Sequence, residues 1–333
     1  MTSPITLRAN LAALCFTAGM ALAASTSVGA AEPIWDANKV EMKRETLAPG
    51  VYALYAKDAK ALNAKGMAAA TSGGLIVGSK ASLLIESFLN QRLNRQAQAL
   101  ARAATSAPLT YVVNTSAHGD HSFGNMFLPA TTRIVQHVKT KAYIDGHLED
   151  DKAFMIKHFG AGRGIEPIKA RTGDVLVPSG GRLSLDLGGK VVEIIDFGFA
   201  QTGGDLFVWE PGAKVLWAGN AIIAVRPALP WLLDGHLLET LATLTRVYEF
   251  LPFDARIVPG HGVPMGREDL IWHLDYLAAV QKGVAAAQAE GLSLEQTVKR
   301  VALPEFRGYA LFDWVHPALN VPAAYKDLAA AKK

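Results

Sequence analysis

The sequence predicts an α+β fold in which two β-sheets pack face to face between outer helices. Short β-rich segments fill two separate parts of the 333-residue chain, and segments with helical periodicity follow each part. No short-period repeat, low-complexity stretch or linker divides the two parts. Sheets and helices must bury their apolar faces against one another. We therefore expect a single domain over residues 32–333.

The first part of the chain is expected to form one sheet with a helix on its face. Apolar, β-branched runs bounded by turn residues predict the strands. Leu93, Ala97 and Leu100 recur at helical spacing, which predicts a helix over 90–104. Residues 139–165 are expected to be helical in part. The expected strands of this part are 51–55, 74–77, 82–85, 109–113 and 132–136.

The second part of the chain is also expected to form strands that are followed by helices. Short apolar runs alternate with glycine-rich turns and predict further strands. Two long segments with helical periodicity follow, and a short helical tail begins after Ser293. The expected strands are 183–187, 191–196, 206–209, 215–217 and 256–258, and the expected helices are 237–250 and 270–290.

Residues 1–31 have the features of a secretory signal peptide that is removed. Arg8 gives a positive start, residues 11–24 are apolar, and the small residues at 28–31 suit a cleavage site. A membrane anchor is the alternative, but the apolar run is short for a bilayer. Cys15 is the only cysteine, so the processed chain has no disulfide and no thiol ligand. An exported, cysteine-free protein fits a periplasmic location.

The charge balance excludes one class of partner. The formal net charge is +3 and falls to +2 when Arg8 is removed with the signal segment. No run of like charges stands out in the sequence. We therefore expect no binding of nucleic acid, and a small molecule as the partner.

The most informative motif lies at residues 114–125, Asn-Thr-Ser-Ala-His-Gly-Asp-His-Ser-Phe-Gly-Asn. It places His118, Asp120 and His121 within four residues, directly after the expected strand 109–113. Imidazole nitrogens and carboxylate oxygens are zinc ligands, and core packing hardly explains three of them so close together. The loop therefore predicts a metal site.

Three further segments complete a pattern that resembles the metallo-β-lactamase superfamily. In that superfamily the motifs are His-x-His-x-Asp-His, His-Thr-x-Gly-Asp, Phe-x-Gly-Asp and a late Gly-His. The matching segments here are residues 116–121, 199–205, 216–220 and 258–262. The resemblance implies the αββα sandwich of this superfamily, with 32–333 as one catalytic domain.

The departures from the pattern decide which metal position is complete. Ser116 and Gln201 stand where the superfamily has two histidine ligands of the first metal, and Asn220 replaces an aspartate that bridges both metals. The resemblance implies that the second metal keeps its whole set. We therefore predict one catalytic zinc, bound by Asp120, His121, His261 and Asn220, with water.

The ligand set suggests a mechanism. Zinc and one carboxylate would leave the site near +1, which lowers the pKa of a bound water. His118, free of the metal, would accept the proton of that water as a general base. The alternative role for His118 is a hydrogen-bonding partner of a ligand. The alternative for the whole cluster is an inactive relative that holds zinc for stability.

The full pattern resembles the zinc-dependent chlorothalonil hydrolytic dehalogenases within the superfamily. This resemblance implies replacement of an aromatic chlorine of tetrachloroisophthalonitrile by hydroxyl, through zinc-bound hydroxide. A superfamily hydrolase of a lactone, β-lactam or thioester and a non-enzymatic zinc-holding periplasmic protein stay open as alternatives.

Other residues carry more limited hypotheses. Trp231 follows Asn220 in a proline-bounded loop and is expected either to stack on an aromatic substrate or to anchor the loop on the core. Ser116 and Gln201 are candidates to orient substrate or water. His147, in an acidic segment, could hold a structural metal between the subunits of a homodimer, or lie on a solvated polar face.

Overall fold

The computed structural model describes residues 34–332, and its first sheet is mixed. Seven strands follow one another in chain order. The first four pair antiparallel, whereas β4 to β7 pair parallel, so the carboxyl ends of β4, β5 and β6 meet at one edge. The strands are β1 (Met42–Ala48), β2 (Val51–Ala56), β3 (Gly73–Val77), β4 (Ser82–Ile85), β5 (Leu109–Val113), β6 (Arg133–His137) and β7 (Val175–Val177).

The second sheet has six strands in the order β13-β12-β11-β10-β9-β8. Only β11 and β12 pair parallel; the other neighbours are antiparallel. The strands are β8 (Arg182–Asp186), β9 (Val191–Ile195), β10 (Phe207–Glu210), β11 (Val215–Gly219), β12 (Arg256–Pro259) and β13 (Met265–Gly266).

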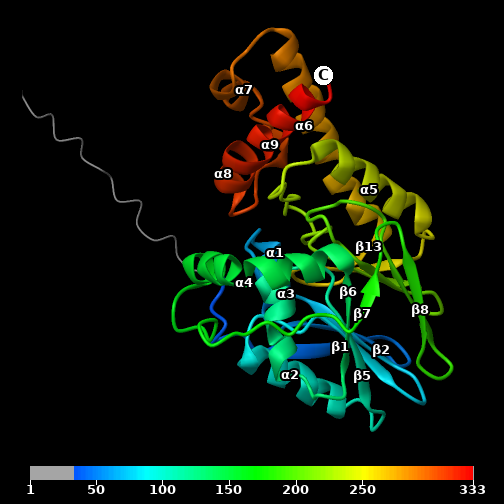
Figure 1. Ribbon diagram of the computed structural model, residues 1–333. Coiled ribbons are helices and arrows are strands. Elements are labelled where there is room, and N and C mark those ends of the chain that lie inside the picture. The colour runs from blue at the N-terminus through cyan, green and yellow to red at the C-terminus, as the bar shows by residue number, and fades with distance from the viewer. Residues whose placement is uncertain (1–33, 333) are drawn as a thin grey trace, which may run out of the picture. The chain divides into compact units, whose positions relative to one another are not determined.

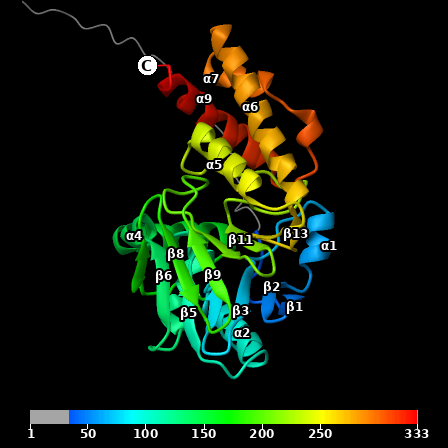
Figure 2. The same cartoon turned by 90° about the vertical axis from the view of Figure 1, so that its right-hand side faces the viewer.

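Helices cover the outer faces of the two sheets. In both views α2 lies on the side of the first sheet, while α5, α6 and α9 gather beyond the second (Figure 1, Figure 2). The α-helices are α1 (Ala59–Ala64), α2 (Gln91–Arg102), α3 (Gly119–Ser122), α4 (Val138–Phe159), α5 (Leu237–Phe250), α6 (Ile271–Ala289), α7 (Leu294–Arg300), α8 (Phe312–Trp314) and α9 (Val321–Ala330). The single-turn segments are η1 (Phe123–Phe127), η2 (Arg267–Leu270), η3 (Pro304–Phe306) and the π-helical η4 (Val315–Asn320).

The two sheets meet at a close contact between β3 and β11. The Trp217 indole nitrogen donates a hydrogen bond to the Gly73 carbonyl at 3.1 Å. A Cβ on Gly74 would lie 2.1 Å from that same nitrogen, so only glycine fits there. Along β11, Trp217 joins the core between the sheets, whereas Leu216 packs on the helical side. The two residues differ in this way because successive side chains of a strand point to opposite faces of the sheet.

The predicted fold class is confirmed: two mixed sheets lie between outer helices. The expected helix at 237–250 coincides with α5, and the other expected strands and helices agree within a few residues. Missed elements include β1, β7, α1 and α9. The predicted signal peptide lies outside the described residues. Among the helices of residues 34–332, none combines the length and apolar composition needed to cross a bilayer.

Candidate metal centre and its pocket

Three candidate metal ligands converge where loops leave the two sheets. Asp120 and His121 lie in the first turn of α3, just after β5, and His261 follows β12. Their ligand atoms all lie within 4.8 Å of one another. The Nε2 atoms of His121 and His261 are each 3.5 Å from Asp120 Oδ2. No other group of three such side chains occurs within residues 34–332.

Each candidate ligand also contacts a second group of the protein. Glu86 Oε1 lies 3.1 Å from His121 Nδ1, the Ala69 carbonyl lies 3.0 Å from His261 Nδ1, and Thr71 Oγ1 donates to Asp120 Oδ2 at 2.6 Å. With both Nδ1 atoms paired in this way, the Nε2 atoms face the metal position. Such partners fix the tautomer and the ring orientation of ligating histidines.

Glu86 changes the charge expected of the site. It is fully buried at the end of β4, and its oxygens lie against three donors: the Thr115 hydroxyl, the Thr115 N–H and His121 Nδ1. Such surroundings suit a carboxylate. A divalent ion with Asp120 and Glu86 sums to zero, rather than the +1 expected from Asp120 alone. Two buried carboxylates also explain why the site suits a cation.

Asn220 and His118 form the fourth side of the site. Asn220 follows β11, and its Nδ2 lies 3.3 Å from His118 Nδ1. An amide NH₂ only donates, so His118 Nδ1 accepts and its neutral ring carries the proton on Nε2. Asn220 Oδ1 is buried and has no hydrogen-bond partner. That oxygen is therefore free to bind a metal.

Burial lowers the pKa of His118 to about 4, although the charge of Asp120 opposes this shift. The ring is therefore neutral at pH 7. The opposite holds for His121: burial lowers its pKa, but Asp120 and Glu86 outweigh burial and raise it to about 9. A metal ion would take the place of the His121 proton, because a ligating imidazole must be neutral.

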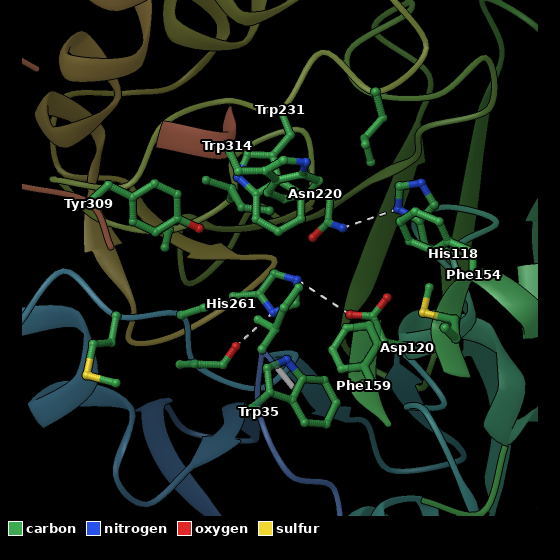
Figure 3. Close-up of a pocket in the computed structure, with 18 residues that line it drawn as sticks. Trp35, His118, Asp120, Phe154, Phe159, Asn220, Trp231, His261, Tyr309 and Trp314 are labelled. Carbon is green, nitrogen blue, oxygen red and sulfur yellow. Dashed lines mark hydrogen bonds and ion pairs between the residues drawn. The ribbon is translucent and has the colours of Figure 1, made fainter. Parts of the chain in front are cut away.

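A pocket opens beside these polar groups (Figure 3). His118, Asp120, Asn220 and His261 line one side of it, and aromatic side chains line much of the rest. Trp231 and Trp314 meet edge to face with ring centres 5.1 Å apart, and Trp35 meets Phe159 at 4.7 Å. Phe154 and Tyr309 complete the aromatic wall. The pocket therefore has a polar side, formed by the first four residues, and an aromatic side, formed by the aromatic residues.

Residues 68–261 match the family model of the metallo-beta-lactamase superfamily. The chain belongs to the metallo-β-lactamase superfamily. Members of this superfamily are generally metal-dependent hydrolases, and the group of Asp120, His121 and His261 is the candidate metal site of this hydrolase.

Solved structures of this superfamily share the fold. A metallo-β-lactamase from Pontibacter korlensis is 16% identical, with a TM-score of 0.55, and the match covers 72% of this chain and 99% of that one. The metallo-β-lactamase DIM-1, exposed to ceftazidime, is 15% identical with a TM-score of 0.56, covering 72% and 98%. At this identity the likeness concerns the fold alone.

The motif pattern places Ser116 and Gln201 where the superfamily has histidine ligands of another metal. Ser116 and Gln201 are buried, and neither Ser116 Oγ nor the Gln201 amide contacts a hydrogen-bonding partner among the described residues. Asp205 fixes the Gln201 loop by accepting three backbone N–H groups, from residues 200–202, at 2.7–3.0 Å. Serine and glutamine are weak zinc ligands compared with histidine.

His147 does not belong to the candidate metal site or to the lining of its pocket. It sits on α4 with its side chain 56% exposed, and its Nδ1 is 3.6 Å from Asp150 Oδ2. Within residues 34–332 no third candidate ligand joins this pair. Whether a second subunit completes it stays a prediction.

Sequence reasoning missed part of the site. Glu86 and Thr71 have no motif of their own, although Glu86 directly follows a buried strand and is itself buried, which is unusual for a carboxylate. The wall residues Trp35, Tyr309 and Trp314 lie outside the family match and far from the ligands in the sequence. Only folding brings them to the pocket.

Proposed function

We propose that this hydrolase is a zinc-dependent dehalogenase that replaces an aromatic chlorine of chlorothalonil, tetrachloroisophthalonitrile, by hydroxyl. The observation that carries the proposal is a group of three candidate metal ligands, two of which line an aromatic-walled pocket. The resemblance of the motif pattern to the chlorothalonil hydrolytic dehalogenases supports the choice of substrate.

The residues present fit one zinc ion. Asp120, His121 and His261 offer a carboxylate oxygen and two imidazole nitrogens, and the unpaired Asn220 Oδ1 is a fourth donor. When bound, zinc lowers the pKa of a coordinated water toward neutrality and so supplies a nucleophile. Because Ser116 and Gln201 replace two histidines, we propose one ion per active site.

His118 would take the proton of the attacking water. Its Nε2 carries the ring proton, so Nδ1 is the atom that accepts, and Asn220 Nδ2 must then give up its contact with that atom. The neutral state of His118 at pH 7 suits a base, although a pKa near 4 makes it a weak one. A neighbouring cation would lower that pKa further, so the proton must pass on to solvent.

The aromatic wall suits a flat, electron-poor ring. Trp231 and Trp314 offer ring faces and edges to such a substrate. The oxygen of water forms a bond to a chlorine-bearing carbon, the C–Cl bond breaks, and chloride leaves with the bonding electrons. The products are the 4-hydroxy compound, chloride and a proton. Chloride is a weak base, so no general acid is required. Ser116 and Gln201 are proposed to orient substrate or water.

Chloride release from chlorothalonil, without glutathione, tests the activity. The purified mature protein should release chloride when it holds zinc and stop when a chelator removes the zinc. His118→Ala should lower turnover by about 10²–10⁴-fold, the usual contribution of a general base, while zinc content stays at one ion per chain. Two tightly bound ions per active site would refute the one-zinc proposal.

A hydrolase of a lactone, β-lactam or thioester is the second candidate, because the similar solved structures are metallo-β-lactamases. Turnover of a chromogenic β-lactam without chloride release from chlorothalonil would favour it. If neither wild type nor His118→Ala turns over any of these substrates, a non-enzymatic zinc-holding role gains support.

Further proposals concern the whole molecule. We propose that 1–31 is a removed signal peptide, that 32–333 is a single catalytic domain, and that the mature protein is periplasmic without a membrane anchor. A structural metal at His147 that joins two subunits of a homodimer is also proposed. Mass spectrometry of the exported protein and its mass in solution, with and without chelator, test these points.

A further inference from the structure

A buried side chain, Asn320, bonds the backbone of the loop that carries Trp231 on both sides of the tryptophan. The amide of Asn320 donates from Nδ2 to the Pro230 carbonyl at 2.7 Å, and its Oδ1 accepts from the Leu232 N–H at 2.9 Å. Both bonds go to backbone atoms on either side of Trp231. Asn320 is fully buried, 89 positions further along the chain than the loop residue it flanks.

A chain of hydrogen bonds fixes the amide of Asn320 in turn. Its Nδ2 also donates to the Tyr276 hydroxyl at 2.9 Å. That hydroxyl lies 2.8 Å from His316 Nδ1, and His316 Nε2 lies 2.7 Å from the Val301 carbonyl. A carbonyl only accepts, so His316 Nε2 donates, Nδ1 accepts, and Tyr276 donates to it. Every member is satisfied, which makes such a network rigid.

The segment that supplies Asn320 also supplies a neighbour for the Trp231 ring. The π-helical turn η4 ends at Asn320, and Trp314 immediately precedes it. Trp314 meets the Trp231 ring edge to face, while Asn320 holds the backbone on both sides of Trp231. A π-helical turn is rare and frequently marks a functional site. One short segment thus contacts both the ring of Trp231 and the backbone beside it.

We propose that Asn320 is a positioning residue for substrate recognition: it fixes Trp231 in the pocket wall and so determines affinity for a flat aromatic substrate. The identity of that substrate rests on the proposed function. Asn320 does not line the pocket and does not touch the metal ligands. Its effect should therefore appear in substrate binding and not in metal binding.

The experiment compares Asn320→Ala with Gln288→Ala in the full chain. Gln288 is a suitable control because its amide bonds α6 to α9, through the Tyr325 carbonyl at 2.7 Å, just as that of Asn320 bonds η4 to α6, but it does not contact the Trp231 loop. We expect Asn320→Ala to raise KM for chlorothalonil about 3- to 10-fold, the range of an aromatic contact. The value of kcat should change less than about 2-fold, because the interaction lost is a binding one. Zinc content should stay constant, and Gln288→Ala should match the wild type.

A double-mutant cycle separates positioning from general damage. In a Trp231→Ala background, Asn320→Ala should raise KM no further, because the two residues act through one another. An equal rise in both backgrounds, an unchanged KM, or a loss of zinc would overturn the proposal. Should Asn320→Ala fail to fold, Asn320→Ser replaces it, since a short hydroxyl cannot bond both backbone groups.

Amide hydrogen exchange tests Asn320 without any substrate. Asn320→Ala should speed exchange over residues 228–235 while residues 116–125 keep the wild-type rate. A wild-type protein that releases no chloride refutes the proposed function, but this measurement still decides on Asn320. Equal exchange of the loop in wild type and variant would refute the positioning role.

Discussion

The polar and aromatic sides of the pocket are built differently. The polar side consists of residues that follow β5, β11 and β12, in loops or in the short helix α3, and all lie inside the family-matched residues 68–261: His118, Asp120, Asn220 and His261. The aromatic side draws on Trp35, Tyr309 and Trp314, all outside that range. The metal site thus belongs to the common core of the superfamily, whereas much of the wall belongs to segments flanking it.

The difference also concerns how each side is fixed. Every ligand on the polar side has a second partner at hydrogen-bond distance, as His121 has in Glu86. The aromatic side is held by edge-to-face contacts and, for Trp231, by the backbone bonds of Asn320. Changes to the metal ligands or their partners should therefore alter metal binding, and changes to the aromatic side should alter substrate binding.

The largest effect on metal affinity is expected on the polar side, from Glu86→Gln. Glutamine keeps the size of the side chain but removes the charge that faces His121 Nδ1. Loss of such a partner typically weakens metal binding about 10–100-fold. Competition with a chromogenic chelator measures the zinc affinity. Glu45→Gln is the control, because Glu45 bonds Tyr55 and Arg256 away from the site. Equal zinc affinity in wild type and Glu86→Gln would show that Glu86 does not support the ligand.

A smaller effect is expected on the free energy of unfolding at acidic pH, from a histidine in α6. His273 in α6 is fully buried, and burial lowers its pKa to about 4. Its pKa in the unfolded chain is about 6.5, so the unfolded state binds the proton first as pH falls. The stability from this group is complete above pH 6.5 and is lost progressively down to pH 4, with a loss of about 2 kcal/mol at pH 5.

Urea unfolding at pH 7.5 and pH 5 measures this effect. His273→Leu, which cannot titrate, should lose less stability than the wild type between these pH values. Parallel losses in the two proteins would show that His273 takes up its proton in the folded state as readily as in the unfolded chain.

The smallest effect is expected from Trp314→Leu on the aromatic side. Leucine keeps apolar contact but removes the edge-to-face pair with Trp231, so KM for chlorothalonil should rise about 2- to 10-fold with zinc content unchanged. Steady-state kinetics with metal analysis checks both. Phe253→Leu is the control, since Phe253 is 79% exposed and lies outside the pocket lining. A loss of zinc in Trp314→Leu would break the separation between the two sides.

The sequence predicted the polar side better than the aromatic side for a physical reason. His118, Asp120 and His121 lie within four residues, so local spacing alone brings them together. Helix α5 was predicted equally well, because the spacing of apolar residues over Leu237–Phe250 is helical. The meeting of Trp35, Trp231 and Trp314 depends on tertiary packing, which no local pattern records. No sequence pattern indicates the role of Glu86, because a single carboxylate after a strand has no periodic signal.

The order of the pocket residues along the chain has a consequence for biosynthesis. His261 is the last of the metal ligands, and Tyr309 and Trp314 come well after it. A chain synthesised from its amino end therefore contains every ligand before it contains the whole aromatic wall. Helix α9 packs on α5 and α6, so the aromatic side of the pocket is completed by the segments of the chain that are synthesised last.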